Sequence, residues 1–214
     1  MPPMSQPDSP DPTNHDFADR YATGQTPWEI GEPQPPFVQH AALVESPVLD
    51  LGCGTGELAV YFASLGHAVV GVDPEAEAVN AARGKAAAAG VDATFEVGSA
   101  QDLAQTGRTY ATILDCLLFH IFDDQQRTQY VDSVRAALRP GGRLLMLVFS
   151  DAEPPGNGPR RISERELRDC FADGFEIETI EPVRLVMRPE DAGLFSEGGP
   201  HGLWAVIRRT GDGA

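Results

Sequence analysis

The feature that most constrains the fold is an alternation of short apolar runs with helical patterns, which begins at Ser46. Such runs, rich in apolar and β-branched residues, are typical of parallel strands that are buried on both faces. The first five are Pro47–Gly52, Ala68–Asp73, Thr94–Gly98, Tyr110–Cys116 and Arg143–Ser150. Two later runs, Phe175–Glu181 and Leu203–Arg209, alternate more strongly and suit the end of a sheet.

Helical patterns fill the gaps between these runs. Apolar residues share one face in Gly56–Leu65 and Asp124–Leu138, and the alanine-rich segment Pro74–Ala89 is followed by a glycine stop. Ser163 and Glu166 form a capping box that predicts another helix start. The sequence therefore predicts an α/β fold, with a doubly wound, seven-stranded, mostly parallel sheet and helices on both faces.

The domain organisation follows from length and proline content. The chain has 214 residues, enough for one domain with a sizeable core. Residues 1–13 carry five prolines and little that is apolar, which predicts a disordered leader. Residues 14–45 form a proline-rich N-terminal segment, and residues 46–214 form the α/β domain.

Composition disfavours several classes of protein. The net charge of −16, with Lys85 as the single lysine, disfavours nucleic-acid partners, which bind proteins largely through Lys and Arg. No apolar run approaches ~20 residues, and no signal peptide is visible, so we expect a cytoplasmic protein without a membrane span. The three cysteines and five histidines are scattered, which predicts reduced thiols and no metal site.

The segment LDLGCGTG, Leu49 to Gly56, leaves a predicted strand and enters a helix. Gly52, Gly54 and Gly56 allow a tight turn and a close approach of backbone to a ligand, at a point where free N–H groups gather. The alternative is a merely tight strand-to-helix turn, because short glycine motifs carry false positives. Asp73, at the end of the second strand, is placed to accept both hydroxyl hydrogens of an adenosine ribose, or else caps the next helix.

The glycine spacing discriminates between cofactors. A dinucleotide fingerprint has the pattern GxGxxG, whereas here the glycines follow GxGxG. The preceding acid, Asp50, suits a cationic group better than a pyrophosphate. A sulfonium with an α-amino group therefore fits better than a diphosphate.

With these residues the chain resembles the class I S-adenosylmethionine-dependent methyltransferases, over about residues 46–150. The resemblance implies that Gly52, Gly54 and Gly56 face the methionine part of the cofactor, with Asp73 and the adjoining Pro74 at the ribose. Val97–Leu103 resembles the family's third-strand motif, but Ser99 stands where that motif has an acid. We therefore expect Ser99 and Ala100 to line the adenine pocket, with Asp102 as a substitute acid or a solvated loop residue.

The segment Leu114–Asp124, at the carboxyl end of the fourth strand, is the predicted active-site segment. Asp115 and Cys116 are expected beside the cofactor, and Phe119 and His120 follow in a short loop facing the acceptor. His120 is the candidate general base, since an unperturbed imidazole titrates near pH ~6.5. A packed, hydrogen-bonded structural histidine is the alternative.

Two further segments are candidates for the rim of the site. The Pro/Gly-rich loop Phe149–Glu166 contains Arg160 and Arg161, which either face an anionic acceptor group or are surface arginines. The segment Pro189–Gly202 is a second candidate for closing the pocket.

Within the superfamily, PWEIGEPQP (Pro27–Pro35), FHIFDD and VFSDAEPPGNGPRR resemble segments of the thiopurine S-methyltransferase-like branch and related bacterial small-molecule methyltransferases. This resemblance implies that residues 14–45 act as a lid, with Trp28 against the cofactor or acceptor. Prolines would hold Trp28 and Phe37 in extended backbone, with Phe37 contacting the acceptor.

The sequence thus predicts an S-adenosylmethionine-dependent methyltransferase that leaves S-adenosylhomocysteine as product. Its acceptor would be a small aromatic or heteroaromatic molecule, methylated at sulfur, oxygen or nitrogen by in-line displacement, and we expect a monomer or homodimer. A non-catalytic S-adenosylmethionine-binding or regulatory module is the alternative, and a nicotinamide dehydrogenase comes third.

Overall fold

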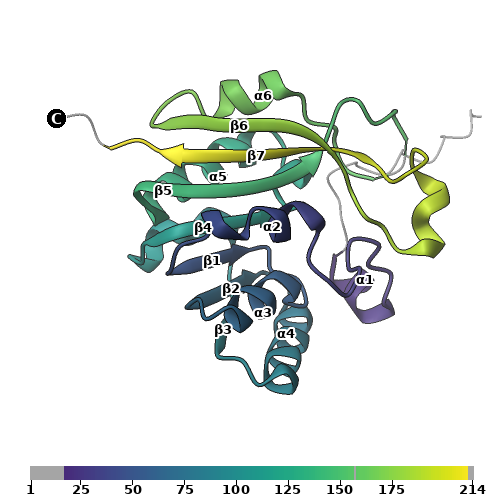
Figure 1. Ribbon diagram of the computed structural model, residues 1–214, viewed down its shortest axis with the longest axis horizontal. Coiled ribbons are helices and arrows are strands. Elements are labelled where there is room, and N and C mark those ends of the chain that lie inside the picture. Colours follow the sequence, from purple (N-terminus) through teal and green to yellow (C-terminus); the bar gives the residue numbers. More distant parts are fainter. Residues whose placement is uncertain (1–16, 157, 212–214) are drawn as a thin grey trace, which may run out of the picture.

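A single seven-stranded sheet forms the centre of the protein (Figure 1). The computed structural model describes residues 17–156 and 158–211, so the predicted leader, residues 1–13, lies outside the described residues. The strands are β1 (Val48–Leu51), β2 (Val69–Asp73), β3 (Ala93–Val97), β4 (Tyr110–Cys116), β5 (Leu138–Phe149), β6 (Phe175–Arg184) and β7 (His201–Arg209). Their order is β3-β2-β1-β4-β5-β7-β6, and only β7 runs antiparallel to its neighbours.

All seven predicted strands are confirmed, with changes at their ends. The largest change is in β5, which starts at Leu138 rather than near Arg143. Leu138 pairs with Tyr110 before the register shifts, and Arg143 pairs with Thr112 after it. The RPGG sequence is therefore an irregularity within β5, where Gly141 adopts a positive φ of 81°.

Helices cover both faces of the sheet, as predicted. One face packs against α5 (Asp124–Ala137) and α6 (Glu164–Cys170), which contribute Tyr130, Val134 and Leu167 to the core. The other packs against α3 (Glu57–Ser64) and α4 (Ala76–Ala89), and its core includes Phe62 and Val79. The capping box of Ser163 and Glu166 is confirmed at the start of α6. Within the described residues, no helix has the length and apolar character that crossing a membrane requires.

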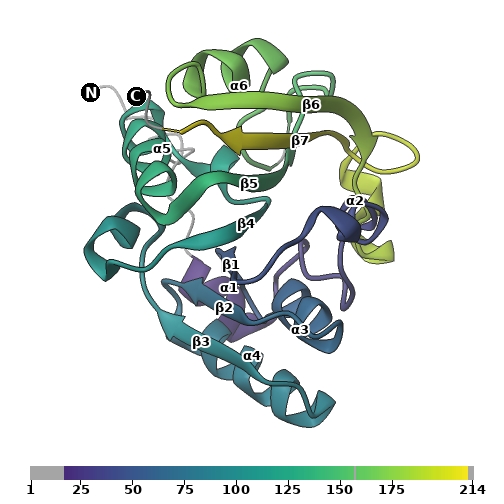
Figure 2. The same cartoon turned by 60° about the vertical axis from the view of Figure 1, so that its left-hand side comes forward.

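The N-terminal segment contains two short helices that were not predicted from the sequence, α1 (Phe17–Thr23) and α2 (Pro35–Gln39). Two prolines open α2, where their missing N–H groups cost nothing, because the first turn of a helix has no partners for them. Phe37 therefore lies in a helix, and the prediction of extended backbone there is wrong. Figure 2 shows α2 beside the chain between β6 and β7, to which it is bound through Gln34.

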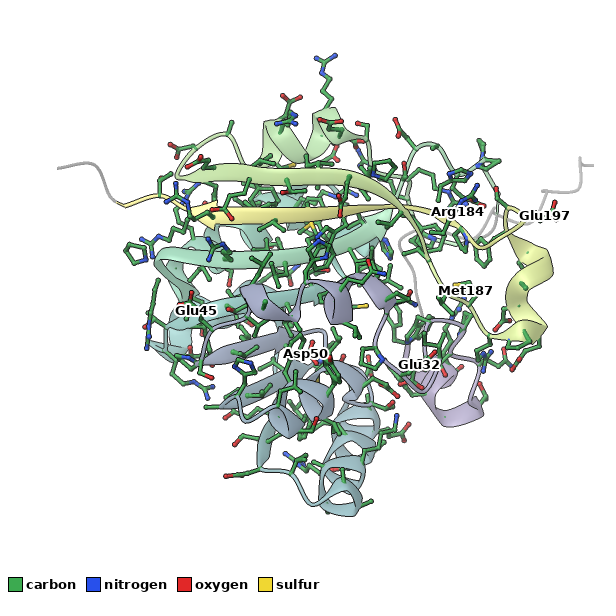
Figure 3. The ribbon with its side chains drawn as sticks, viewed as in Figure 1. Glu32, Glu45, Asp50, Arg184, Met187 and Glu197 are labelled. Atoms are coloured by element: carbon green, nitrogen blue, oxygen red, sulfur yellow. The ribbon has the colours of Figure 1, made fainter. Side chains whose placement is uncertain are left out.

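The strand order places a crevice at one end of the sheet. The order reverses between β1 and β4, and ligands of open α/β sheets bind outside the carboxyl ends of strands at such a reversal. Figure 3 shows Asp50 of β1 near the middle of the molecule, with Glu32 and Met187 together toward this end and Glu45 at the opposite end.

Candidate active site

A cavity of about 370 Å³ opens at the carboxyl ends of β1, β2, β4 and β5. This volume is within the range of small-molecule sites, roughly 300–1,000 Å³. Of the predicted site residues, it brings together Trp28, Asp50, Gly52, Gly54, Asp73, Pro74, Cys116 and His120. The predicted location of the site is thus supported by the geometry.

The glycine-rich turn forms one wall of the cavity. Gly52 and Gly54 have φ angles of 70° and 52°, a left-handed conformation that side chains with a Cβ adopt only at a cost. The Gly54 N–H donates to Asp73 Oδ2 (2.9 Å), and Glu75 N–H donates to Asp73 Oδ1 (2.9 Å). Asp73 therefore ties the turn to the end of β2, and each of its oxygens keeps a second lone pair for a ligand hydroxyl.

Asp50 is an acid in an apolar environment. Its side chain is 2% exposed, and its Oδ2 accepts from the Ala59 N–H (3.0 Å). Burial raises the Asp50 pKa to about 7 in total, a value that includes the lowering effect of that hydrogen bond and the raising effect of the nearby carboxylates of Glu57 and Asp73. Burial also raises the pKa of Asp73.

The acids on this wall fit a cationic cofactor. In residues 17–156 and 158–211, neither Asp50 nor Asp73 forms an ion pair with a basic side chain. Buried carboxylates without a counter-ion favour a bound cation, because it relieves the cost of keeping them charged. A sulfonium with an α-amino group supplies positive charge, and the ribose hydroxyls supply donors for Asp73.

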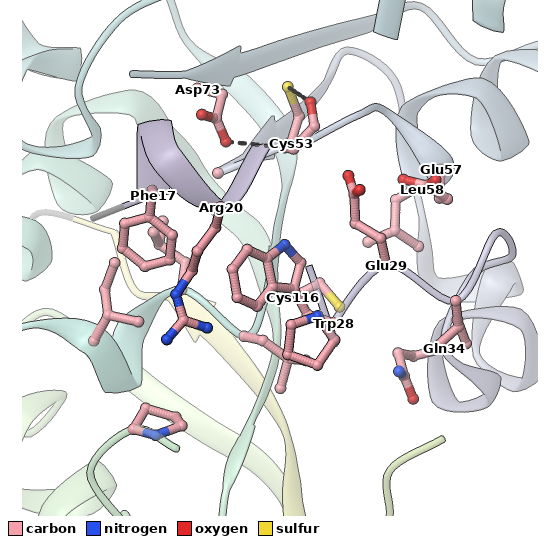
Figure 4. A pocket seen from close by; sticks show the side chains of 18 of the residues that line it. Phe17, Arg20, Trp28, Glu29, Gln34, Cys53, Glu57, Leu58, Asp73 and Cys116 are labelled. Atoms are coloured by element: carbon pink, nitrogen blue, oxygen red, sulfur yellow. Dashed lines mark hydrogen bonds between the residues drawn. The ribbon is translucent and has the colours of Figure 1, made fainter. Parts of the chain in front are cut away.

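Residues of the N-terminal segment line the cavity. Trp28 packs edge-on against Phe17 (5.5 Å between ring centroids) and Tyr21 (6.0 Å), and its Nε1–H donates to the Tyr21 hydroxyl (3.3 Å). Figure 4 shows Trp28 at the centre of the group, with Phe17 and Arg20 on one side and Glu29 on the other. The Glu29 carboxylate accepts from Thr55 N–H (3.1 Å), which connects this segment to the glycine-rich turn.

The opposite side of the cavity is largely apolar. Its side chains come from the turn after β4, the end of β5 and the segment before β7: Leu117, Leu118, His120, Ile121, Phe149, Met187 and Phe195. Leu117 is the single non-glycine residue of the described chain with a positive φ, 66°. Such a conformation costs on the order of 1–3 kcal/mol and is typical of functional sites.

Asp115 stabilises the turn after β4 through hydrogen bonds and does not line the cavity. It is fully buried, and its carboxylate accepts from the N–H groups of Leu118 (3.0 Å) and Phe119 (3.3 Å) and from the Tyr130 hydroxyl (2.5 Å). Burial raises its pKa to about 6. Its predicted contact with the cofactor is therefore replaced by a structural role.

The structure contradicts the predicted acceptor contacts of Phe37, Phe119 and Arg160. Phe37 is fully buried against Trp204 (4.9 Å between centroids), and Phe119 is fully buried against Tyr130 (5.4 Å). Arg160 pairs with Asp124 and Glu166 (2.5 Å each) outside the cavity. Apolar character in a motif does not show whether a ring faces the core or the ligand.

Besides Asp115, three further predicted cofactor residues do not line the cavity. Ser99 caps the 3-10 helix η2 (Ala100–Thr106) by accepting from Gln101 N–H (3.2 Å), and Ala100 packs in the core. A Cβ on Gly56 would lie 2.8 Å from Ala82 Cβ, so this glycine allows α3 and α4 to pack closely. These residues stabilise the surroundings of the site.

Several residues of the cavity were not predicted from the sequence, including Tyr21, Glu29, Leu117, Met187 and Phe195. The place of Phe149 in the cavity could have been predicted from the sequence, because this residue lies at the carboxyl end of a predicted strand, where the site was expected. Phe195 lies within Pro189–Gly202, the segment expected to help close the pocket. Met187 carried no such signal, since it lies in irregular chain far from the glycine-rich turn.

Comparison with known proteins supports the assignment that this geometry suggests. Residues 48–142 match a family described as "Methyltransferase domain". The chain is 34% identical over 192 residues to a 2-heptyl-1-hydroxyquinolin-4(1H)-one methyltransferase from Mycobacteroides abscessus, covering 87% of this chain and 83% of the relative. The chain belongs to the class I S-adenosylmethionine-dependent methyltransferases.

Solved structures agree with this family. One, from work on the conversion of a disulfide bond into a thioacetal group during echinomycin biosynthesis, has a TM-score of 0.77 and 34% identity, covering 87% of this chain and 86% of that chain. Another, the magnesium protoporphyrin IX methyltransferase of Synechocystis PCC 6803 with bound S-adenosylhomocysteine, has a TM-score of 0.67 and 20% identity, covering 94% and 100%. At 20% identity, the similarity to this second structure supports the fold alone.

The methyltransferase family establishes the activity and the cofactor in general terms. The protein is an S-adenosylmethionine-dependent methyltransferase that acts on small molecules. The alternatives of a non-catalytic module and of a nicotinamide dehydrogenase are therefore not retained.

Proposed function

We propose that this methyltransferase transfers a methyl group to a sulfur, oxygen or nitrogen atom of a small aromatic or heteroaromatic molecule. The observation that carries the proposal is the apolar, ring-rich side of the cavity. Its rings come from the N-terminal segment, the end of β5 and the segment before β7: Phe17, Trp28, Phe149 and Phe195. Aromatic side chains stack favourably on aromatic ligands and exclude water from them.

The M. abscessus relative supports the same acceptor class. Its name specifies a quinolone ring with a 1-hydroxyl and a heptyl chain. The flexible side chain of Met187 and the ring of Phe195 line the cavity of the present protein, and such side chains suit an alkyl substituent. A heteroaromatic hydroxyl or thiol with an apolar substituent is therefore the acceptor that we favour.

The residues of the cavity would contribute binding and orientation. When bound, S-adenosylmethionine supplies an electrophilic methyl group on a sulfonium. Asp73 would accept from the ribose hydroxyls, and Asp50 would favour the positive charge, directly or through water. Holding the acceptor atom in line with the methyl group can supply on the order of 7–11 kcal/mol in favourable cases.

We infer that residues 14–45 act as a lid, of which the structure describes residues from Phe17. The buried Gln34 side chain pairs with the Val186 backbone in both directions (2.8 and 2.9 Å), and Arg188 donates to the Gly24 carbonyl (3.3 Å). Glu29 joins the same segment to the turn after β1. These contacts at separate points support a fixed cover over the site.

A screen with methyl-labelled S-adenosylmethionine, read by mass spectrometry, tests the proposal. The panel would contain 1-hydroxyquinolin-4-ones with and without an alkyl chain, aryl thiols, phenols and N-heterocycles, with aliphatic alcohols and amines as matched acceptors without a ring. We expect label on a heteroatom of ring-containing acceptors, and higher kcat/KM with the alkyl chain. Equal or better transfer to the aliphatic acceptors, or transfer to carbon, would contradict the proposal.

A further inference from the structure

We propose that His120 donates a hydrogen bond from Nε2 to the deprotonated heteroatom of the acceptor, and that it is not the general base of the reaction. This inference rests on the proposed function and deepens it. It also replaces the sequence-based expectation that His120 removes the proton.

The tautomer of His120 is fixed by the backbone. The Phe149 N–H donates to His120 Nδ1 at 3.0 Å. An amide N–H is a donor and never an acceptor, so Nδ1 must present its lone pair. A neutral imidazole carries one proton, and here that proton is on Nε2.

The Phe149 amide has little freedom to release this bond. Phe149 ends β5, pairs with Gly202 of β7, and accepts from Ile162 N–H at its carbonyl (2.8 Å). The His120 ring lies edge-on to the Phe149 ring, with 5.3 Å between centroids, and is 3% exposed. His120 is therefore held by both the backbone and the ring of Phe149.

The orientation decides which nitrogen meets a bound molecule. His120 belongs to the 3-10 helix η3 (Phe119–Ile121) and lines the cavity beside Ile121 and Phe149. Because Nδ1 is turned to the β5 backbone, any contact of a ring nitrogen with a bound acceptor is through Nε2. In the neutral ring that nitrogen is a donor.

A general base would need the opposite tautomer. For Nε2 to accept a proton from an acceptor, its lone pair must be free and the ring proton must be on Nδ1. That proton would face the Phe149 N–H, so that two donors would meet in a buried place. Proton removal by Nε2 would break the hydrogen bond that positions the ring.

The charges around the cavity are distributed unevenly. The carboxyl groups that line it come from the N-terminal segment, β1, α3 and the end of β2: Glu29, Glu32, Asp50, Glu57, Asp73 and Glu75. The other ionisable groups of its lining are Arg20, Tyr21, Cys53 and Cys116, and Arg161 lies over the outer side of the Phe149 ring at 5.1 Å. Among the described residues, the lining from η3, β5 and the segment before β7 contributes no carboxyl group.

On this side of the cavity, the proton of His120 Nε2 would form a charge-assisted hydrogen bond with an ionised acceptor atom. The acceptor loses its proton to water before transfer. A lone pair of its heteroatom forms the bond to the methyl carbon, and the electron pair of the broken carbon–sulfur bond stays on sulfur, leaving a thioether. The Nε2 proton remains on His120 throughout. The acceptors selected are those that ionise near neutral pH, such as N-hydroxy heteroaromatics, aryl thiols and acidic phenols.

Three variants separate a donor from a base. His120→Gln can place an amide N–H near the position of Nε2 but has no basic nitrogen. His120→Asn can accept from Phe149 N–H but is too short to place a donor at Nε2, and His120→Phe keeps only the ring. We expect His120→Gln to keep kcat/KM within about fivefold of wild type. The Asn and Phe variants should lose about 10- to 100-fold, the range for a hydrogen bond to a charged group.

Two controls keep the test independent of folding. Thermal unfolding and S-adenosylhomocysteine affinity should be unchanged in His120→Gln and His120→Asn. A series of 1-hydroxyquinolin-4-ones with graded acidity should give pH–rate profiles that follow the acceptor pKa in wild type and in His120→Gln alike. Equal losses in all three variants, or a profile that follows an enzyme group and disappears in His120→Gln, would overturn the inference.

Nitrogen-15 NMR of the histidine-labelled resting protein at pH 7.5 provides a test that needs no turnover. We expect the neutral tautomer with a proton on Nε2, and a proton on Nδ1 would overturn the inference. If wild type methylates no acceptor of the panel, the proposed function fails, and this spectrum still shows whether the tautomer was assigned correctly.

Discussion

The two sides of the cavity differ in how they are built. The cofactor side comes from two short segments, residues 50–58 and 73–75, and presents buried carboxylates on rigid strand ends. The acceptor side combines the N-terminal segment, the turn after β4, the end of β5 and the segment before β7, and it presents rings, methionine and one histidine. The residues of the cofactor side lie close together in the sequence. Those of the acceptor side lie far apart in the sequence and are brought together by folding.

This difference implies a division of roles. A side made of strand ends and a helix start holds a constant ligand, because the sheet fixes it. A side made of loops and a cover can vary with the acceptor while the sheet remains unchanged. Changes on the cofactor side should therefore alter cofactor affinity, and changes on the acceptor side should alter acceptor selectivity.

The largest effect is expected at Asp73. Asp73→Asn removes the charge and one acceptor, and it weakens the link to Gly54. We expect S-adenosylmethionine affinity, measured by calorimetry, to fall about 10- to 100-fold, as for loss of hydrogen bonds to a charged group. Asp102→Asn, an exposed acid on the same sheet edge, is the matched control and should bind normally. Unchanged affinity in Asp73→Asn would refute its role at the ribose.

Trp28→Ala should have the next largest effect, because it removes the centre of the cover. We expect kcat/KM to fall about tenfold through lost contact area, with the fold retained because Trp28 lies outside the main core. Trp28→Phe is the matched variant, since it keeps an aromatic ring but loses the Nε1–H bond to Tyr21. If Trp28→Ala has wild-type kinetics, residues 17–34 are only a linker.

Asp50 should make cofactor affinity depend on pH. Burial raises its pKa to about 7, and a bound cation favours the carboxylate, so binding below pH 7 requires loss of a proton. Affinity for S-adenosylmethionine should therefore rise by up to about tenfold from pH 6 to pH 8.

S-adenosylhomocysteine, which shares the α-amino group but lacks the sulfonium, is the control for the Asp50 prediction. Its affinity should change less over the same range, and Asp50→Asn should remove the difference between the two ligands. The same pH slope in Asp50→Asn would assign the titration to another group.

The smallest effect is expected at Arg160. It pairs with Asp124 and Glu166 at the surface, where ion pairs contribute only about 0–1 kcal/mol. Arg160→Ala should change acceptor KM less than about twofold and stability only slightly.

The neighbouring residue, Arg161, donates to the carbonyls of Pro159 (2.6 Å) and Pro154 (3.1 Å), which fixes the loop beside the cavity. Arg161→Ala should therefore raise KM more, and the reverse order would contradict the placement of Arg160 outside the site.

The predictions from sequence succeeded where periodicity and turn chemistry act locally. The seven strands, the capping box of Ser163 and the glycine-rich turn were all correctly located, because each depends on neighbours in the chain. The antiparallel insertion of β7 between β5 and β6 carried no such signal, since any order of the last strands satisfies the same apolar pattern.

The errors at Phe37 and Phe119 have one physical cause. Phe37, Phe119 and His120 all stand in segments that contain pocket residues, and the sequence does not show which way each ring turns. Phe37 and Phe119 turn into the two cores on opposite faces of the sheet, whereas His120 turns to the cavity. A shift of about one residue along a short helix is enough to move a side chain from one environment to the other.

The sheet, the glycine-rich turn and the acid at the end of β2 could be predicted from the sequence, and with them the class of cofactor. These features are encoded within segments of a few residues, where backbone conformation and burial leave few choices. The acceptor side could not be predicted in this way, because folding brings Trp28, His120, Phe149 and Phe195 together from across more than half of the chain. The tautomer of His120 also depends on the tertiary structure, since a single amide of β5 fixes which nitrogen carries the proton.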